Sequence, residues 1–143
     1  MTYRLWQRLA LGYLALNSLM VGLWAQIAPR SFYDNFPGFG AGWVAVDGPF
    51  NEHLIRDVGG LNLALAAVLI AAMVMLTAPL VTAAAVAALL YGVPHVIYHL
   101  FNTDGLSTGD VIASIGGLTI SVALPVMLLF ANRISTANGP GTR

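Results

Sequence analysis

The sequence predicts an all-α integral membrane four-helix bundle with a structured extracytoplasmic loop between helices 1 and 2. Three observations support this fold class. Only 8% of the 143 residues are charged and 58% are hydrophobic, whereas about 25% of the residues in a soluble domain are charged. Four segments contain about 20 mostly apolar residues, the length that crosses a bilayer core of about 30 Å. The chain length suits one domain.

The first two helices are predicted at residues 5–28 and 51–77. The first ends at Pro29, and its apolar stretch is longer than that of a cleavable signal peptide, so we expect it to be retained. The second begins with the polar turn Asn51-Glu52-His53.

The last two helices are predicted at residues 80–101 and 109–132. Only residues 77–79 join the second helix to the third, so these two should be antiparallel neighbours. Ser107 or Thr108 can cap the fourth helix after a loop that is rich in turn formers. Residues 1–134 then form one domain, and the Gly/Pro/Thr/Asn-rich tail 135–143 is expected to be disordered.

The long connection between the first two helices, residues 30–50, has an unusual composition. It reads RSFYDNFPGFGAGWVAVDGPF and contains four glycines, two prolines and six aromatic residues. Aromatic residues at this density favour the membrane interface. We therefore expect this segment, called the cap loop from here on, to lie over one end of the bundle.

The charges indicate an orientation in the cell membrane and exclude several functions. Four of the six arginines flank the end with both termini, which favours cytoplasmic termini under the positive-inside tendency. The chain has no cysteine, which excludes disulfides and thiolate metal sites. It also has no lysine for Schiff-base chemistry. A net charge of zero without a basic patch argues against binding to nucleic acid.

The acids and histidines all lie toward the end of the bundle away from the termini. Ionisable groups at membrane depth are costly and usually face the bundle interior. At a rise of about 1.5 Å per residue, Asp57 and His95 each lie about 9 Å inside a helix end, so they share one layer. The nine residues are Asp34, Asp47, Glu52, Asp57, Asp104, Asp110, His53, His95 and His99.

This layer predicts acid–base chemistry on a small lipophilic molecule, because an Asp beside a His can tune the latter for proton transfer. The candidate catalytic residues are Asp57, His95, His53, Glu52 and Asp110. The candidate ligand-binding residues are Arg56, which would stabilise an anion, Tyr91, Tyr98, Asn17 and Trp43. A structural alternative is an ion-pair network of Glu52, Arg56 and Asp57 that only neutralises charge.

The histidines also suggest cofactors. His53 and Asp57 are four residues apart on one helix face, as are His95 and His99 on another, so the four could bind a divalent metal. Alternatively, the histidines form hydrogen bonds to loop backbone. Haem with two axial histidines is another option, with glycine pairs at 59–60 and 116–117 making room for the ring. Such glycines more often serve helix packing.

The run SFYDNFPGFGAGWVAVDGPFNEHLIRDVGGLNLALA resembles one in small four-helix bacterial membrane proteins of the DoxX-like kind. The resemblance covers mainly residues 31–66 and implies fold and location, with no catalytic residue carried over.

The predicted function is therefore binding and conversion of a small lipophilic molecule, by acid–base or metal-assisted chemistry, in a multi-pass protein of the cell membrane. One alternative is a non-catalytic accessory subunit that binds a partner membrane protein, and another is a haem-binding redox protein. A transporter is the weakest reading, because the half near the termini lacks intramembrane charges, although a homo-oligomer could form a pathway.

Overall fold

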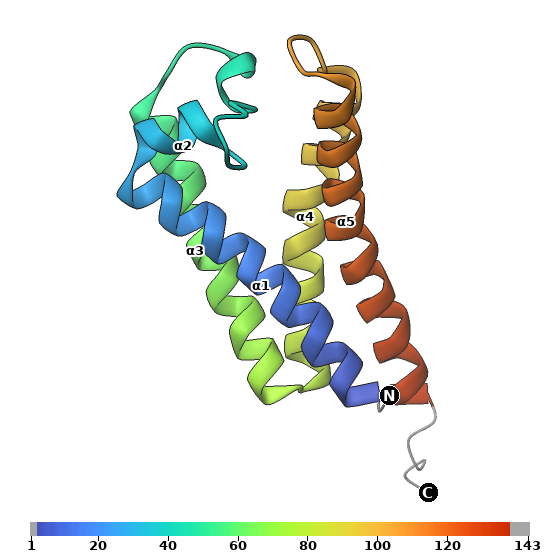
Figure 1. The fold of residues 1–143 in the computed structure, drawn as a ribbon. Coiled ribbons are helices and arrows are strands. Elements are labelled where there is room, and N and C mark those ends of the chain that lie inside the picture. Colours follow the sequence, from blue (N-terminus) through green and yellow to red (C-terminus); the bar gives the residue numbers. More distant parts are fainter. Residues whose placement is uncertain (1–2, 138–143) are drawn as a thin grey trace, which may run out of the picture.

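The computed structural model describes residues 3–137 and contains four long helices packed as a bundle (Figure 1). Each long helix is apolar enough to cross a bilayer, which confirms the predicted fold class. A short helix, α2 (Pro29–Asn35), and a 3-10 turn, η1 (Ala45–Asp47), lie between the first two long helices. The long helices are α1 (Tyr3–Ile27), α3 (Glu52–Met75), α4 (Ala78–Phe101) and α5 (Thr108–Ala137).

The helix boundaries differ from the predicted ones near two prolines and, by a larger margin, at the end of α5. Pro29 begins α2, and Pro79 lies in the first turn of α4. Proline fits there because the first N–H groups of a helix have no intrahelical partner. Leu76, with a left-handed φ of 48°, separates α3 from α4. α5 continues to Ala137, past the predicted start of the tail at 135, and residues 138–143 lie outside the described residues.

The four helices form two pairs that meet at one end of the bundle. α1 packs along α3, and α4 packs along α5, whereas the two pairs touch each other less extensively. Figure 1 shows the pairs close together near the chain termini and diverging toward α2. We call these two regions the closed end and the loop end.

Small and branched apolar side chains fill the closed end. Small residues let membrane helices approach closely, where packing contacts supply much of the attraction. Asn132 of α5 reinforces this end, because its Nδ2 donates hydrogen bonds to the Ala78 carbonyl at 2.8 Å and to the Thr82 hydroxyl at 3.0 Å. The buried cluster contains Ala10, Leu11, Leu14, Ala15, Leu69, Ala72, Val81, Ala84, Ala85 and Leu128.

Two glycines allow α1 and α3 to pack closely near the loop end. A Cβ on Gly22 would lie 2.9 Å from the side chain of Leu63, and one on Gly59 would lie 3.0 Å from Cγ of Gln26. At this contact, Nε2 of Gln26 donates to the Arg56 carbonyl at 2.6 Å, and the Arg56 guanidinium donates to the Gln26 carbonyl. These reciprocal hydrogen bonds join the end of α1 to the first turns of α3.

A second buried cluster attaches the cap loop to the α1–α3 pair. Phe32 of α2 packs with Ala25 and Ile55, and its ring centroid lies 5.8 Å from that of Trp24 and 4.9 Å from that of Phe36. The cap loop therefore belongs structurally to α1 and α3.

Polar contacts complete the fold of the cap loop. The Tyr33 hydroxyl donates to the Gly48 carbonyl at 2.6 Å. The Arg30 guanidinium lies 5.1 Å from the ring centroid of Phe50 and donates to Asp34 at 2.7 Å. The hydrogen bond to the Asp34 carboxylate raises the pKa of Arg30.

Candidate functional site

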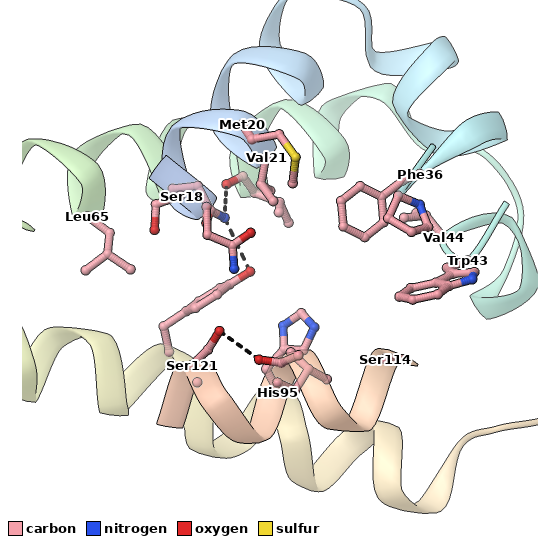
Figure 2. Close-up of a pocket in the computed structure, with 18 of the residues that line it drawn as sticks. Ser18, Met20, Val21, Phe36, Trp43, Val44, Leu65, His95, Ser114 and Ser121 are labelled. Carbon is pink, nitrogen blue, oxygen red and sulfur yellow. Dashed lines mark hydrogen bonds between the residues drawn. The ribbon is translucent and has the colours of Figure 1, made fainter. Parts of the chain in front are cut away.

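A cavity of about 470 Å³ lies between the two helix pairs at the loop end. Small-molecule sites typically enclose about 300–1,000 Å³ and are mostly apolar, as this cavity is. All four long helices and the cap loop contribute to its lining. Figure 2 shows His95, Ser114 and Ser121 on one side of the cavity, facing Ser18 and Val21 across it.

The cap loop lies at the outer end of the cavity and is bonded to α4 and α5 there. Nε1 of Trp43 donates a hydrogen bond to Oδ1 of Asp110 in the first turn of α5, at 2.9 Å. The Ser107 hydroxyl donates to Oδ2 of the same carboxylate at 2.6 Å. The Tyr98 hydroxyl lies 3.5 Å from Oδ1 of Asp47. The loop carried by α1 and α3 is thus joined to α4 and α5.

α4 presents a row of aromatic and imidazole rings to the cavity. Tyr91, His95 and His99 follow one another at four-residue spacing, with ring centroids 5.4 Å and 4.9 Å apart. Nδ1 of His99 is buried and has no hydrogen-bond partner among the described residues. Because that atom has almost no accessible surface, a molecule in the cavity would meet this row through its other polar atoms.

The rest of the polar lining is uncharged except for one acid. α1 supplies Asn17 and Ser18, and α5 supplies Ser114 and Ser121. Asp47 is the only acid that lines the cavity among the described residues, and no arginine lines it there. Because the chain also lacks lysine, the described residues of the lining offer no permanent positive charge to a bound anion.

Several residues predicted from the sequence lie together around this cavity, while Tyr98 and Asp110 meet the cap loop beside it. The predicted site residues that line the cavity are Asn17, Trp43, Tyr91, His95 and His99.

Four other predicted site residues lie on α3 but do not line the cavity: Glu52, His53, Arg56 and Asp57. The cavity contacts α3 through Leu54, Ile55, Val58 and Asn62. Successive helical residues are turned by about 100°, so the Asp57 side chain points away from the face that carries Val58. Asp57 and His95 therefore do not share the cavity, and the predicted acid–base pair is not assembled.

These four residues pair with one another on the outside of α3. Nε of Arg56 lies 2.8 Å from Oε1 of Glu52, which confirms that contact of the predicted ion-pair network. Nε2 of His53 lies 3.5 Å from Oδ2 of Asp57, with the two side chains 87% and 58% exposed. Arg56 serves the contact with α1 and lies away from the cavity.

The structure does not bring together the four residues of the predicted metal site, which are His53, Asp57, His95 and His99. Within residues 3–137, no group of three or more His, Asp or Glu side chains is arranged to hold a metal ion. The physical reason is that His53 and Asp57 lie on the face of α3 that points away from the cavity. Of the four residues, only the two histidines of α4 line it. A haem held by two histidines from neighbouring helices would need His53 of α3 with His95 or His99 of α4, and of these three only the α4 histidines line the cavity.

Asn62 is a site residue that the sequence analysis missed. It is only 3% exposed, and its Nδ2 donates to the Val58 carbonyl at 2.9 Å and to the Tyr91 hydroxyl at 3.3 Å. The available signal was an amide in the middle of an apolar span, because such groups usually face a bundle interior. The same signal had marked Asn17.

Comparison of the chain with protein-family models, curated proteins and solved structures finds no match. The assignment as a multi-pass membrane protein therefore rests on the four long apolar helices.

Proposed function

We propose that this multi-pass membrane protein binds a neutral lipophilic molecule that carries a hydroxyl or carbonyl group. The apolar part of the molecule occupies the cavity, and its polar group lies beside His95 and His99. The observation that carries the proposal is the pair of α4 histidines, His95 and His99, in the lining of a mostly apolar cavity. A hydrogen bond between the polar group of the ligand and one of these imidazoles would contribute about 0.5–1.5 kcal/mol.

The charge of the lining supports a neutral ligand. A buried carboxylate or phosphate needs a cation beside it, because desolvation of an unpaired charge is costly. No arginine lines the cavity within the described residues, and the acid Asp47 would repel an anion. A neutral hydroxyl can donate to or accept from an imidazole.

A second candidate function is acid–base conversion of the bound molecule. Asp47 and His95 both line the cavity, and an imidazole near a carboxylate is suited to proton transfer near neutral pH. The pair of Asp47 and His95 takes the place of the predicted pair of Asp57 and His95. The test compares the molecules that co-purify with the wild type and with His95→Gln. Two chemically different molecules support conversion, and identical molecules support binding alone.

We also propose the finer assignments that the sequence suggests. The run at residues 31–66 supports a relationship to DoxX-like membrane proteins, and the arginines near both termini support cytoplasmic termini. An accessory subunit of a larger membrane complex remains the alternative function. The accessory-subunit alternative predicts a protein partner that co-purifies in a fixed ratio. Substitutions in the cavity should not affect binding of that partner.

Two adjacent glycines of α5 provide a matched test of ligand binding. A Cβ on Gly116 or Gly117 would meet no atom within 4 Å, but of the two only Gly117 lines the cavity. Gly117→Leu should therefore fill the cavity, whereas Gly116→Leu adds the same side chain outside it.

The measurement is native mass spectrometry of the detergent-solubilised protein with added hexadecanol, a neutral long-chain alcohol. The wild type and Gly116→Leu should each carry one hexadecanol, and Gly117→Leu should bind it at least about tenfold more weakly, or about 1.4 kcal/mol. Equal binding by the two variants, or no binding by the wild type, would contradict the proposal.

A further inference from the structure

We infer that the bound molecule exchanges with the bilayer sideways, through a groove between α3 and α4, instead of past the cap loop. The inference rests on the proposed function and adds the route by which the ligand arrives. The groove is shallow and almost entirely apolar. Leu61, Ala64 and Val68 of α3 form one side, and Ala87 and Leu90 of α4 form the other.

The groove and the cavity share a wall. Asn62, Leu65 and Tyr91 line both of them, so a single layer of side chains separates the two spaces. Figure 2 shows Leu65 at the opposite end of the cavity from Trp43 of the cap loop. The groove is therefore a second approach to the cavity, remote from the loop.

The depth of the groove identifies what fills it. Leu65 precedes Met75, the last residue of α3, by ten residues, which is about 15 Å along the helix axis. The apolar core of a bilayer is about 30 Å thick, so the groove opens near its middle. Leu61 and Leu90, 66% and 74% exposed, flank it there. Its occupant is therefore a hydrocarbon chain, either of a bilayer lipid or of the ligand.

The wall is held by few interactions. One hydrogen bond of 3.3 Å, from Asn62 to the Tyr91 hydroxyl, crosses it between α3 and α4. These helices also pack less extensively than α1 with α3 or α4 with α5, and only Leu76 and Thr77 connect them at the closed end. A rotation of Leu65 and the loss of one hydrogen bond would join the two spaces.

A ligand that leaves past the cap loop has to break more contacts. That exit breaks the Trp43–Asp110 hydrogen bond and the contact between Tyr98 and Asp47. It also moves a loop that is fixed by the buried aromatic cluster around Phe32. The sideways route therefore breaks fewer of these contacts than the route past the cap loop.

The test measures exchange of bound hexadecanol for deuterated hexadecanol supplied in phosphatidylcholine vesicles, followed by native mass spectrometry. Ala64→Trp places a large side chain in the groove, and Ala64 does not line the cavity. Ala67→Trp is the matched control, because Ala67 is exposed on the same helix but lines neither space. Leu61→Trp gives a second block of the groove that does not depend on the folding of Ala64→Trp.

Exchange should slow about tenfold or more in Ala64→Trp and Leu61→Trp, with the same number of molecules bound at equilibrium, and should be unchanged in Ala67→Trp. Asp110→Ala removes the acceptor of Trp43 outside the cavity and should leave the exchange rate unchanged. Faster exchange in Asp110→Ala, or an unchanged rate in both groove variants, would overturn the sideways route while leaving binding intact. A wild type without bound hexadecanol would refute the proposed function itself.

Discussion

The indole N–H of Trp43 and the carboxylate of Asp110, 67 residues apart in the sequence, form a hydrogen bond of 2.9 Å. Trp43 belongs to the cap loop, which packs on α1 and α3, whereas Asp110 belongs to the first turn of α5. The bond therefore joins the two helix pairs at the end where Figure 1 shows them diverging. Ser107, which donates to the other oxygen of the carboxylate, holds the acceptor in place.

Trp43→Phe should loosen the cap loop, because it keeps the ring but removes the donor. A hydrogen bond to a charged group contributes about 1.5–3 kcal/mol, so exchange of amide hydrogens in the cap loop should accelerate about tenfold or more. Hydrogen–deuterium exchange with mass spectrometry measures this. Asp110→Asn retains an acceptor and should have the smaller effect, and an unchanged loop in Trp43→Phe would show that the bond is not stabilising.

Gly59→Ala should destabilise the bundle by about 1–3 kcal/mol, the usual cost of overpacking a close contact. The added Cβ would lie 3.0 Å from Cγ of Gln26 and 3.1 Å from Cβ of Ala25. Thermal unfolding in detergent measures the loss. Gly116→Ala is the control, because its Cβ meets no atom within 4 Å and alanine favours a helix. Equal unfolding temperatures for the two variants would contradict this account of the α1–α3 contact.

Asn132→Ala should weaken the closed end by about 1 kcal/mol, the typical scale for interhelical hydrogen bonds in membranes. The change removes the bonds to the Ala78 carbonyl and to the Thr82 hydroxyl. Unfolding of the variant in a denaturing detergent gives the change in free energy. Thr119→Ala, an exposed position on the same helix, should leave the stability unaltered.

His95→Leu should weaken hexadecanol binding about tenfold, or about 1.4 kcal/mol, whereas Asp57→Asn and His53→Gln should not change it. The reason is that His95 lines the cavity, while the other two side chains lie on the outer face of α3. Native mass spectrometry across a range of hexadecanol concentrations gives the three affinities. A loss of binding in Asp57→Asn would place that residue back in the site.

The orientation in the membrane can be tested with single cysteines, because the native chain has none. Asp104→Cys lies between α4 and α5 at the loop end, and Arg4→Cys lies at the opposite end of α1. A maleimide that cannot cross membranes should label intact cells at position 104 only, and should label position 4 after lysis. The reverse pattern would show that the loop end faces the cytoplasm.

Much of the fold follows from the sequence, because span length and apolar composition identify membrane helices almost directly. The antiparallel neighbours α3 and α4 also follow, since only Leu76 and Thr77 separate them. The pairing of α1 with α3 and of α4 with α5 could not be predicted. It depends on which small residues meet, such as Gly22 with Leu63, and that information is not periodic in the chain.

The depth of the candidate residues along their helices could be predicted from the sequence. The direction in which each side chain points could not. His95 and Asp57 were placed in one layer because distance along a helix follows from residue number. Which of them faces the cavity depends on how α3 is rotated against α1, and that is set by tertiary contacts. The same reason explains why Asn62 lines the cavity while Arg56 serves the α1–α3 contact.

The two separate buried clusters predict two unequal cooperative units in the unfolding of the bundle. The closed-end cluster draws residues from all four long helices, whereas the loop-end cluster around Phe32 involves only α1, α3 and the cap loop. Regions with fewer buried contacts open locally at lower free energy. A molecule that fills the cavity touches both helix pairs at once, so its binding energy couples the weaker unit to the stronger one and makes unfolding more nearly all-or-none.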